Sequence, residues 1–241
     1  TYRFRQPLYG SEQFHEGILE TDGLTLSHGG KEYISTIREI QNISVNHKIP
    51  KQEPLEWTSR KTAFLWKQSN IFDMENLPHT NNWDTWQHYY TYYDALKRMG
   101  CQVTMIREQD RFDPDKYPFM IAPAYSLVKK ALIKKWSEYV ENGGHLVLSC
   151  RTGMKDNNGH LHEAMLQEPV WELTGAKVDF YDHLPPGKYG EIIMDGEEYR
   201  WNVWADILIP DKNTEVLAKH ADQFYSGSPV VVSRKAGKGS V

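Results

Sequence analysis

Residues 119–150, FMIAPAYSLVKKALIKKWSEYVENGGHLVLSC, contain the pattern that decides the fold. An apolar run at 119–125 is followed by a helical pattern at 129–144 that ends in two glycines, and a second apolar run follows at 145–150. Short apolar runs without alternation are typical of strands buried on both faces, and glycine commonly ends a helix. The stretch therefore predicts a strand, a helix and a second, parallel strand.

The same alternation of strands and helices precedes this stretch. TAFLWK at 62–67 and CQVTMI at 101–106 read as strands, and the segment 83–100 between them reads as a helix that ends at Gly100. Right-handed crossovers between parallel strands place helices on both faces of a sheet. We therefore predict an α/β fold with a flavodoxin-like, doubly wound parallel sheet.

The chain beyond Cys150 has a looser pattern. A loop rich in glycine and asparagine, with a short helix, follows the last predicted parallel strand. Residues 191–208, EIIMDGEEYRWNVWADIL, predict a hairpin with an Asp-Gly turn, and residues 214–241 predict another pair of strands, the last of which runs to Val241.

The chain before residue 58 is organised differently. A helix is expected from about Lys31, with Ser27 and a glycine pair at its start. The segment after it, which contains two prolines and several charges, is typical of a linker. We place a domain boundary there and predict domains at 1–57 and 58–241.

Bulk composition excludes several classes of protein. The chain has 241 residues with 39% hydrophobic residues and a net charge of -4, which argues against disorder and against nucleic acid as a partner. No apolar run reaches the roughly 18 residues that span a bilayer, so no membrane partner is expected and the segment should be soluble. The high aromatic content of 12% suits core packing, subunit interfaces or sugar contacts.

One cysteine follows a predicted strand in a way that resembles a catalytic turn. LSCRTG at 148–153 is similar to the nucleophile turn of class I glutamine amidotransferases, in which a histidine and a carboxylate activate the thiol. No His-x-Glu pair follows Cys150 late in the chain, so a buried, inert thiol is the better interpretation. An amidotransferase-like enzyme using Cys150 stays open as an alternative.

Metal and nucleotide signals are weak. His160 and His162 could point both imidazoles one way, with Glu163 close by, but one histidine pair falls short of the three or four ligands that a metal site usually has. KAGKGS at 235–240 lacks the full frame of a phosphate-binding loop. We therefore predict neither a metal nor a cofactor.

Several short sequence motifs, taken in order along the chain, resemble those of a known family. The chain from residue 2 to 241 resembles the second half of the β-galactosidases of glycoside hydrolase family 42. The motifs on which this resemblance rests are RFRQPLYGSEQFHEGIL, TDGLTLSHGGKEY, LSCRTGMKDNNGHL, WELTGAKV, YRWNVWADIL and TEVLAKHADQFYSGSPVVVSRKAGKGSV.

The resemblance implies a piece of a larger enzyme. Residues 1–57 would be the last βα segment of a (β/α)8 barrel and its linker, and residues 58–241 the trimerisation domain. The parent would be a cytoplasmic homotrimer that hydrolyses terminal non-reducing β-D-galactosides with retention. Its catalytic glutamates lie on earlier barrel strands, so the resemblance implies no catalytic residue in this chain and no activity by the chain alone.

The resemblance also assigns two site residues. Glu12 and His15 resemble the residues that bind hydroxyls of the galactose to be cleaved, while the roles of Arg3, Arg5 and Gln6 stay open. Positions i and i+3 share a face if residues 10–15 form a helical turn. A carboxylate accepts hydrogen bonds from sugar hydroxyls and an imidazole donates or accepts one. A non-catalytic carbohydrate-binding module stays open as a further alternative.

Overall fold

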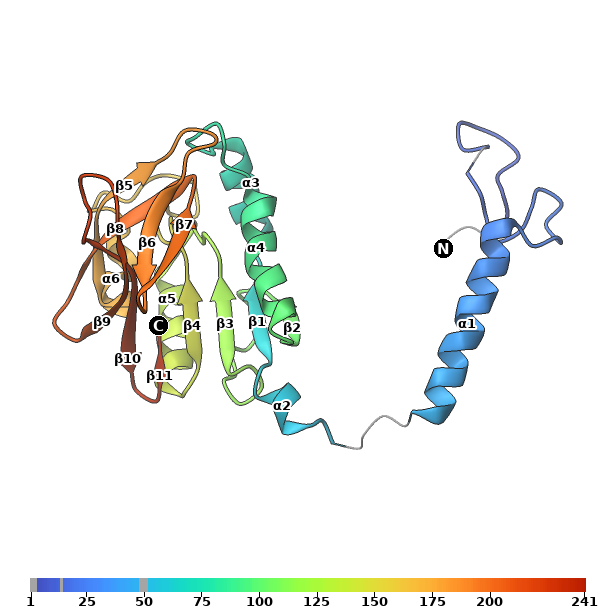
Figure 1. Cartoon of the computed structure of the whole chain (residues 1–241), viewed down its shortest axis with the longest axis horizontal. Coiled ribbons are helices and arrows are strands. Elements are labelled where there is room, and N and C mark those ends of the chain that lie inside the picture. Colours follow the sequence, from blue (N-terminus) through green and yellow to red (C-terminus); the bar gives the residue numbers. More distant parts are fainter. Residues whose placement is uncertain (1–3, 14, 48–51) are drawn as a thin grey trace. The chain divides into compact units, whose positions relative to one another are not determined.

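The computed structural model describes residues 4–13, 15–47 and 52–241 of the chain (Figure 1). They belong to two compact units, Thr1–Glu53 and Pro54–Val241, and each is described by itself. Among the described residues, no helix combines the length and the apolar character needed to cross a lipid bilayer.

In the described part of the first unit, a loop at residues 4–27 leads into helix α1 (His28–Asn46). The Ser27 hydroxyl accepts a hydrogen bond from the Gly30 amide at 2.9 Å and donates one to the Gly17 carbonyl at 2.6 Å. This cap fixes the helix start on the loop. The predicted helix is confirmed, and it begins three residues before the expected Lys31.

The parallel strands of the second unit occur as predicted, although each is shorter than its apolar run. Their order in the sheet is β2-β1-β3-β4, and every neighbouring pair among the four is parallel (Figure 1). The strands are β1 (Thr62–Leu65), β2 (Val103–Ile106), β3 (Phe119–Ala122) and β4 (His145–Leu148).

Helices cover both faces of these strands. The predicted helices are α4 (Thr85–Arg98) and α5 (Lys130–Glu141), while α3 (Gln68–Asn76), like the short α2 (Leu55–Thr58), was not expected. Phe64 of β1 packs with side chains of α3 and α4, whereas its neighbour Leu65 packs with side chains of α5. Successive strand residues point to opposite faces, so the unalternating apolar runs are explained by two cores.

The two glycines of the opening stretch turn the chain from α5 into β4. Gly143 has a φ of 112°, a conformation that residues with a Cβ rarely adopt. A Cβ on Gly144 would lie 2.2 Å from the ring of Tyr139, and the Gly144 amide donates to the Tyr139 carbonyl at 3.0 Å. Both glycines are therefore required for the tight connection between helix and strand.

The remaining strands make the sheet mixed. Helix α6 (Glu168–Thr174) precedes them, and within the described residues the large sheet continues from β4 as β11-β10-β9-β6-β7. Strands β5 and β8 pair separately. The strands are β5 (Ala176–His183), β6 (Gly190–Met194), β7 (Glu197–Trp201), β8 (Trp204–Pro210), β9 (Thr214–His220), β10 (Pro229–Ala236) and β11 (Gly239–Ser240).

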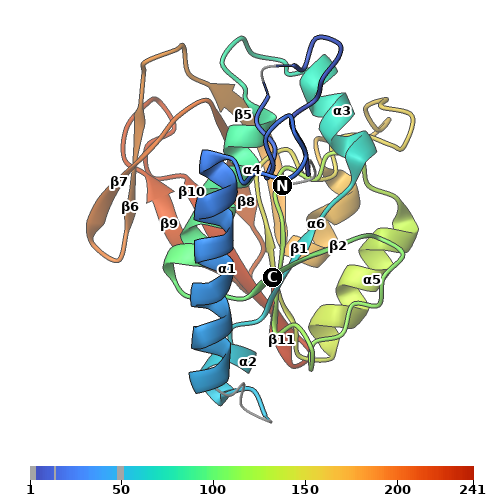
Figure 2. The same ribbon diagram turned by 90° about the vertical axis from the view of Figure 1, so that its right-hand side faces the viewer.

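The predicted hairpin is formed by β6 and β7, with Asp195 and Gly196 in the turn at φ values of 53° and 83°. Figure 2 shows this hairpin at the opposite end of the sheet from β2. The end of the predicted segment, Trp204 onward, instead forms β8 and pairs with β5. Among the described strands, the sheet predicted as parallel is thus parallel only from β2 to β11, and the pairs from β11 to β7 are antiparallel.

The prediction that the last strand runs to Val241 is wrong. The chain turns after β10, and the short strand β11 pairs antiparallel with β10 and parallel with β4. A Cβ on Gly237, whose φ is 57°, would lie 2.6 Å from backbone atoms of Glu141, and one on Gly239 would lie 2.0 Å from the Gly144 carbonyl oxygen. KAGKGS is therefore a turn that fits against the end of α5.

Candidate functional site

The turn that carries Glu12 and His15 lies in the loop before α1. The His15 amide donates to the Glu12 carbonyl at 3.0 Å, which closes a turn of the kind expected from their spacing. The Gln6 side chain donates to the Gln13 carbonyl at 2.7 Å, and the Gln13 side chain donates to the Leu8 carbonyl at 3.0 Å. These bonds hold the turn against residues 5–8, where Arg5 bridges to Leu19.

The side chains of Glu12 and His15 are both exposed at this turn. Exposed apolar side chains surround them in the sequence, including Phe4 at 75% and Tyr9 at 84% relative exposure. Apolar side chains this exposed are typical of a surface that another part of a protein covers. Phe14, between the two candidate residues, and Arg3 lie outside the described residues.

A second set of polar side chains lies at the carboxyl ends of the parallel strands, where α/β sheets usually bind ligands. Lys67, after β1, contacts Glu108, after β2, with 2.9 Å between Nζ and Oε1. The Tyr125 hydroxyl, after β3, donates to the same Glu108 oxygen at 2.8 Å. Burial opposes ionisation of Glu108, but these bonds outweigh it and hold its pKa below the ordinary value. Lys129 also lies 3.5 Å from the other Glu108 oxygen, so Glu108 is held by two lysines and a tyrosine.

Replacing Glu108 with glutamine is expected to lower the free energy of unfolding by about 1–3 kcal/mol at pH 7. The folded pKa of Glu108 is depressed, so its contribution is full above the unfolded pKa and is lost as pH falls through the folded value. The difference between the two proteins should therefore begin to shrink near the unfolded pKa of about 4.3 and vanish only below the folded pKa. Chemical denaturation at several pH values measures this difference.

The matched control is Glu138→Gln, because Glu138 forms an exposed pair with Lys134 at 3.7 Å. A surface pair of this kind contributes less than about 1 kcal/mol. Equal losses for the two variants, or a Glu108→Gln deficit that persists at low pH, would contradict the proposed role of Glu108.

The turn after β4 buries an arginine between two tryptophans. Arg151 is fully buried with a φ of 65°, and its guanidinium carbon lies 4.4 Å and 4.8 Å from the ring centroids of Trp83 and Trp204. The guanidinium donates to the Pro78 carbonyl at 2.9 Å and to the Leu77 carbonyl at 3.3 Å. Its charge is thus stabilised by aromatic faces and carbonyl oxygens.

Asp206 of β8 holds this turn from the other side. Its carboxylate accepts from the Arg151 amide at 2.9 Å, from the Gln167 side chain at 2.6 Å and from the Trp204 indole at 2.8 Å. Burial raises the pKa of Asp206 despite these hydrogen bonds. The cluster joins the parallel half of the unit to the β5–β8 pair.

Cys150 does not have the surroundings of an activated nucleophile. The left-handed residue of the turn is Arg151 and not Cys150. Burial raises the pKa of the Cys150 thiol well above its ordinary value. The nearby His88 contacts the Ser149 hydroxyl at 3.1 Å, and desolvation, with the Arg151 charge, lowers its pKa to about 4. The arrangement does not favour the amidotransferase alternative.

Under native conditions at pH 7, we expect Cys150 to react with iodoacetamide far more slowly than a free thiol, because the thiolate is scarcely populated. Mass spectrometry of the labelled chain measures the rate, and labelling in urea supplies the fully reactive reference. Complete alkylation of Cys150 within minutes, before any alkylation of the buried Cys101, would revive the nucleophile hypothesis.

The weak metal signal finds no support in the structure. Among the described residues, no group of three or more histidine, cysteine or acidic side chains is arranged to hold a metal ion. The Asp156 carboxylate instead accepts from the backbone amides of His160 and Asn158, which closes the loop and lowers its pKa. His160 therefore belongs to a self-contained loop.

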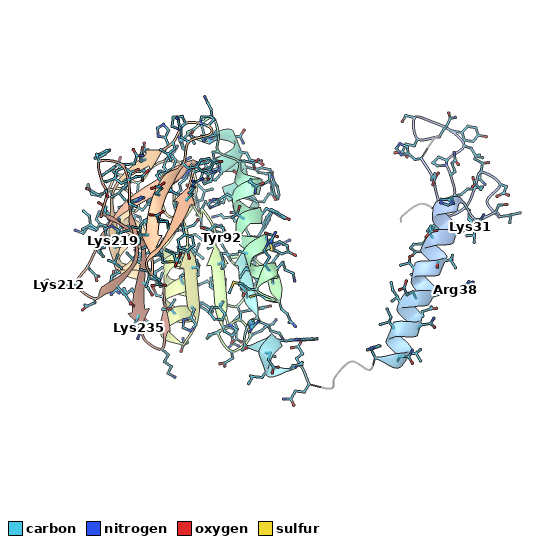
Figure 3. The ribbon with its side chains drawn as sticks, viewed as in Figure 1. Lys31, Arg38, Tyr92, Lys212, Lys219 and Lys235 are labelled. Atoms are coloured by element: carbon cyan, nitrogen blue, oxygen red, sulfur yellow. The ribbon has the colours of Figure 1, made fainter. Side chains whose placement is uncertain are left out.

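Helix α4 presents aromatic side chains on two sides. Tyr92 lies on the side that faces the sheet (Figure 3), and burial raises its pKa to about 12. Trp86, Tyr90 and Tyr93 are 53%, 57% and 40% exposed. These three, called the α4 aromatic face below, are spaced four and three residues apart and share one side of the helix. Exposed aromatic clusters of this kind mark interaction surfaces.

Sequence reasoning missed the buried polar cluster around Arg151 and Asp206. Arginine and aspartate are rarely buried unless paired, so their identities favoured exposed positions. The partners are distant in the sequence, and only the tryptophans in WDTW and YRWNVW, which were read as core or interface residues, indicated that something was enclosed there.

Comparison with known proteins gives consistent results. Residues 60–241 match the family model described as the β-galactosidase trimerisation domain. The chain is 29% identical over its full length to the β-galactosidase BgaH of Haloferax lucentense and 26% identical, over 99% of its length, to LacA of Lactobacillus acidophilus. It spans about a third, 34%, of each of these relatives.

Solved structures of β-galactosidases also superimpose on this chain. The β-galactosidase of the Antarctic haloarchaeon Halorubrum lacusprofundi superimposes with a TM-score of 0.83 at 26% identity, over 100% of this chain and 34% of that one. The β-galactosidase of Bacillus circulans sp. alkalophilus gives a TM-score of 0.84 at 22% identity, over 99% of this chain and 35% of that one. The latter likeness concerns the fold alone.

Proposed function

Because this chain belongs to the β-galactosidase trimerisation domain family over residues 60–241, we propose that it is the segment of a β-galactosidase that assembles the enzyme and completes its galactose pocket. The observation that carries the proposal is the family match, together with full-length similarity to proteins named β-galactosidases. The parent hydrolyses terminal non-reducing β-D-galactosides with retention, and the assembled form is a homotrimer.

We place the end of a (β/α)8 barrel at residues 1–57 and the trimerisation domain at 58–241. The strand order β2-β1-β3-β4 supports a flavodoxin-like assignment for the second domain. The half-exposed apolar side chains of α1, Tyr33, Ile40 and Ile43, support the barrel assignment, because the outer helices of a barrel bury such residues against its strands. Two free cysteines suit a cytoplasmic protein.

Glu12 and His15 form one edge of the galactose pocket in this proposal. Their exposure on a turn that is closed by backbone hydrogen bonds supports it, because such a turn presents both side chains outward. A retaining glycosidase needs two carboxyl groups about 5–5.5 Å apart at the scissile bond. The family resemblance assigns both carboxyl groups to earlier barrel strands, so in this proposal the catalytic pair belongs to other parts of the parent.

The α4 aromatic face is the self-association surface that the second unit offers. Replacing Trp86 and Tyr90 with glutamate places charge in an interface and is expected to dissociate the oligomer in sedimentation velocity experiments. The exposed tryptophan of α2, Trp57, is the matched control, and Trp57→Glu should leave the oligomer intact. An unchanged sedimentation coefficient for the α4 double variant would exclude this surface.

Hydrolysis of an aryl β-galactoside tests the enzymatic part of the proposal. The longer protein that contains this segment should release the aryl group with retention at the anomeric carbon, and the purified 241-residue chain should show no turnover. Turnover by the chain alone, or a longer protein that cleaves other glycosides but no β-galactoside, would contradict the proposal.

A further inference from the structure

We propose that a cleft of about 900 Å³ in the second unit is a binding site for a neutral saccharide, separate from the turn that carries Glu12 and His15. The cleft lies between the start of α5, the loop at residues 156–164 and α6. Its volume falls within the usual range for small-molecule sites, about 300–1,000 Å³. The volume and the polar lining together indicate a small, polar ligand.

The wall of the cleft is partly apolar. Trp171 of α6 lines it together with Val128, Ile133 and Pro169. The Trp171 indole nitrogen donates to the Leu166 carbonyl at 2.9 Å, which fixes the orientation of the ring. A fixed aromatic ring beside aliphatic side chains is a suitable contact for the C–H face of a sugar.

The polar groups of the cleft include one without a partner. The Nε2 atom of His162 is buried, and no described residue forms a hydrogen bond with it. An unpaired buried polar atom carries a desolvation cost, which a ligand or a water would relieve. Lys129 and Lys130, at the start of α5, line the same cleft.

The charged side chains of the cleft argue against an anion or a metal ion as its ligand. Four acidic side chains outnumber two lysines, which disfavours an anion such as phosphate, and the described residues include no acidic or histidine group suited to a metal. Carboxylates accept from sugar hydroxyls, while lysine and histidine donate to them. The charged residues are Lys129, Lys130, Asp156, Glu163, Glu168 and Glu172.

Calorimetric titration of the 241-residue chain with lactose, up to about 50 mM, tests this site. We expect saturable binding that Trp171→Ala and His162→Ala each weaken at least tenfold. Trp57→Ala, which replaces an exposed tryptophan that does not line the cleft, should bind lactose unchanged. Because binding is measured without turnover, failure here is distinguishable from failure of the proposed β-galactosidase function.

The outcomes that overturn the proposal are specific. Absence of lactose binding, loss of binding only in the Glu12→Ala/His15→Ala variant, or saturable binding of inorganic phosphate in place of lactose would each do so. Circular dichroism verifies that the variants are folded. Glu163→Gln changes only an exposed lining residue, so it provides a further test if Trp171→Ala does not fold, and it should also weaken lactose binding.

Discussion

Replacing Asp206 with leucine is expected to lower the free energy of unfolding of the second unit by about 3–5 kcal/mol. Asp206 is 8% exposed, and its carboxylate accepts three hydrogen bonds, from the Arg151 amide, the Gln167 side chain and the Trp204 indole. Leucine leaves all three donors buried without an acceptor, and the Arg151 guanidinium loses the favourable charge of Asp206. Denaturation in guanidinium chloride, followed by tryptophan fluorescence, measures the loss.

The control for this experiment is Asp179→Leu. Asp179 lies on β5, the strand that pairs with the strand of Asp206, but its side chain is exposed. Its replacement should change the free energy of unfolding by less than about 0.5 kcal/mol. A loss below about 1 kcal/mol for Asp206→Leu would mean that the cluster around Arg151 does not hold the two parts of the unit together.

Replacing Glu12 with alanine in the longer enzyme is expected to lower kcat/KM for an aryl β-galactoside by about 10²–10³-fold, since hydrogen bonds to a charged group contribute about 1.5–3 kcal/mol each. The carboxylate is placed to accept from two sugar hydroxyls in the proposed pocket. Steady-state kinetics with the wild-type enzyme and the variant measure the loss.

Glu16→Ala is the matched control, because Glu16 is an exposed glutamate four residues further along the same loop. It should change kcat/KM by less than about threefold, as expected for a surface substitution. Near-normal kcat/KM for Glu12→Ala, or equal losses at both positions, would remove Glu12 from the galactose pocket. Unchanged thermal stability of both variants excludes unfolding as the cause.

The parallel half of the fold was predictable because its strands are short, unalternating apolar runs that end near a helix signal. The run FMIAPAY and the helix ending in Gly143 and Gly144 illustrate this, since local chemistry alone determined them. Helix α3 was missed because QSNIFDMEN carries few strong helix formers and owes its position to contacts of Ile71 and Asn70 with distant residues.

The antiparallel half was predictable only in part. The Asp195-Gly196 turn identified one hairpin, because that dipeptide adopts positive φ at low cost. The return of β11 to β4 depends on close contacts of Gly237 and Gly239 with the end of α5, and these contacts leave no periodic pattern in the sequence. The separate pairing of β5 with β8 likewise depends on the buried cluster around Asp206.

The candidate site residues differ in how far the sequence alone could identify them. Glu12 and His15 came from a family resemblance, since their spacing alone equally fits a solvated turn. The ends of the parallel strands were predictable as the place to look for polar groups, and Lys67, Glu108 and Tyr125 are found there. Their mutual pairing could not be predicted, because it depends on the register of three strands.

Light scattering of the purified 241-residue chain at high micromolar concentration tests most directly whether residues 58–241 assemble the enzyme. The proposed trimerisation predicts a particle mass close to three times the 28.1 kDa of the chain, falling toward the single-chain mass on dilution. A mass of 28.1 kDa at every concentration would contradict it.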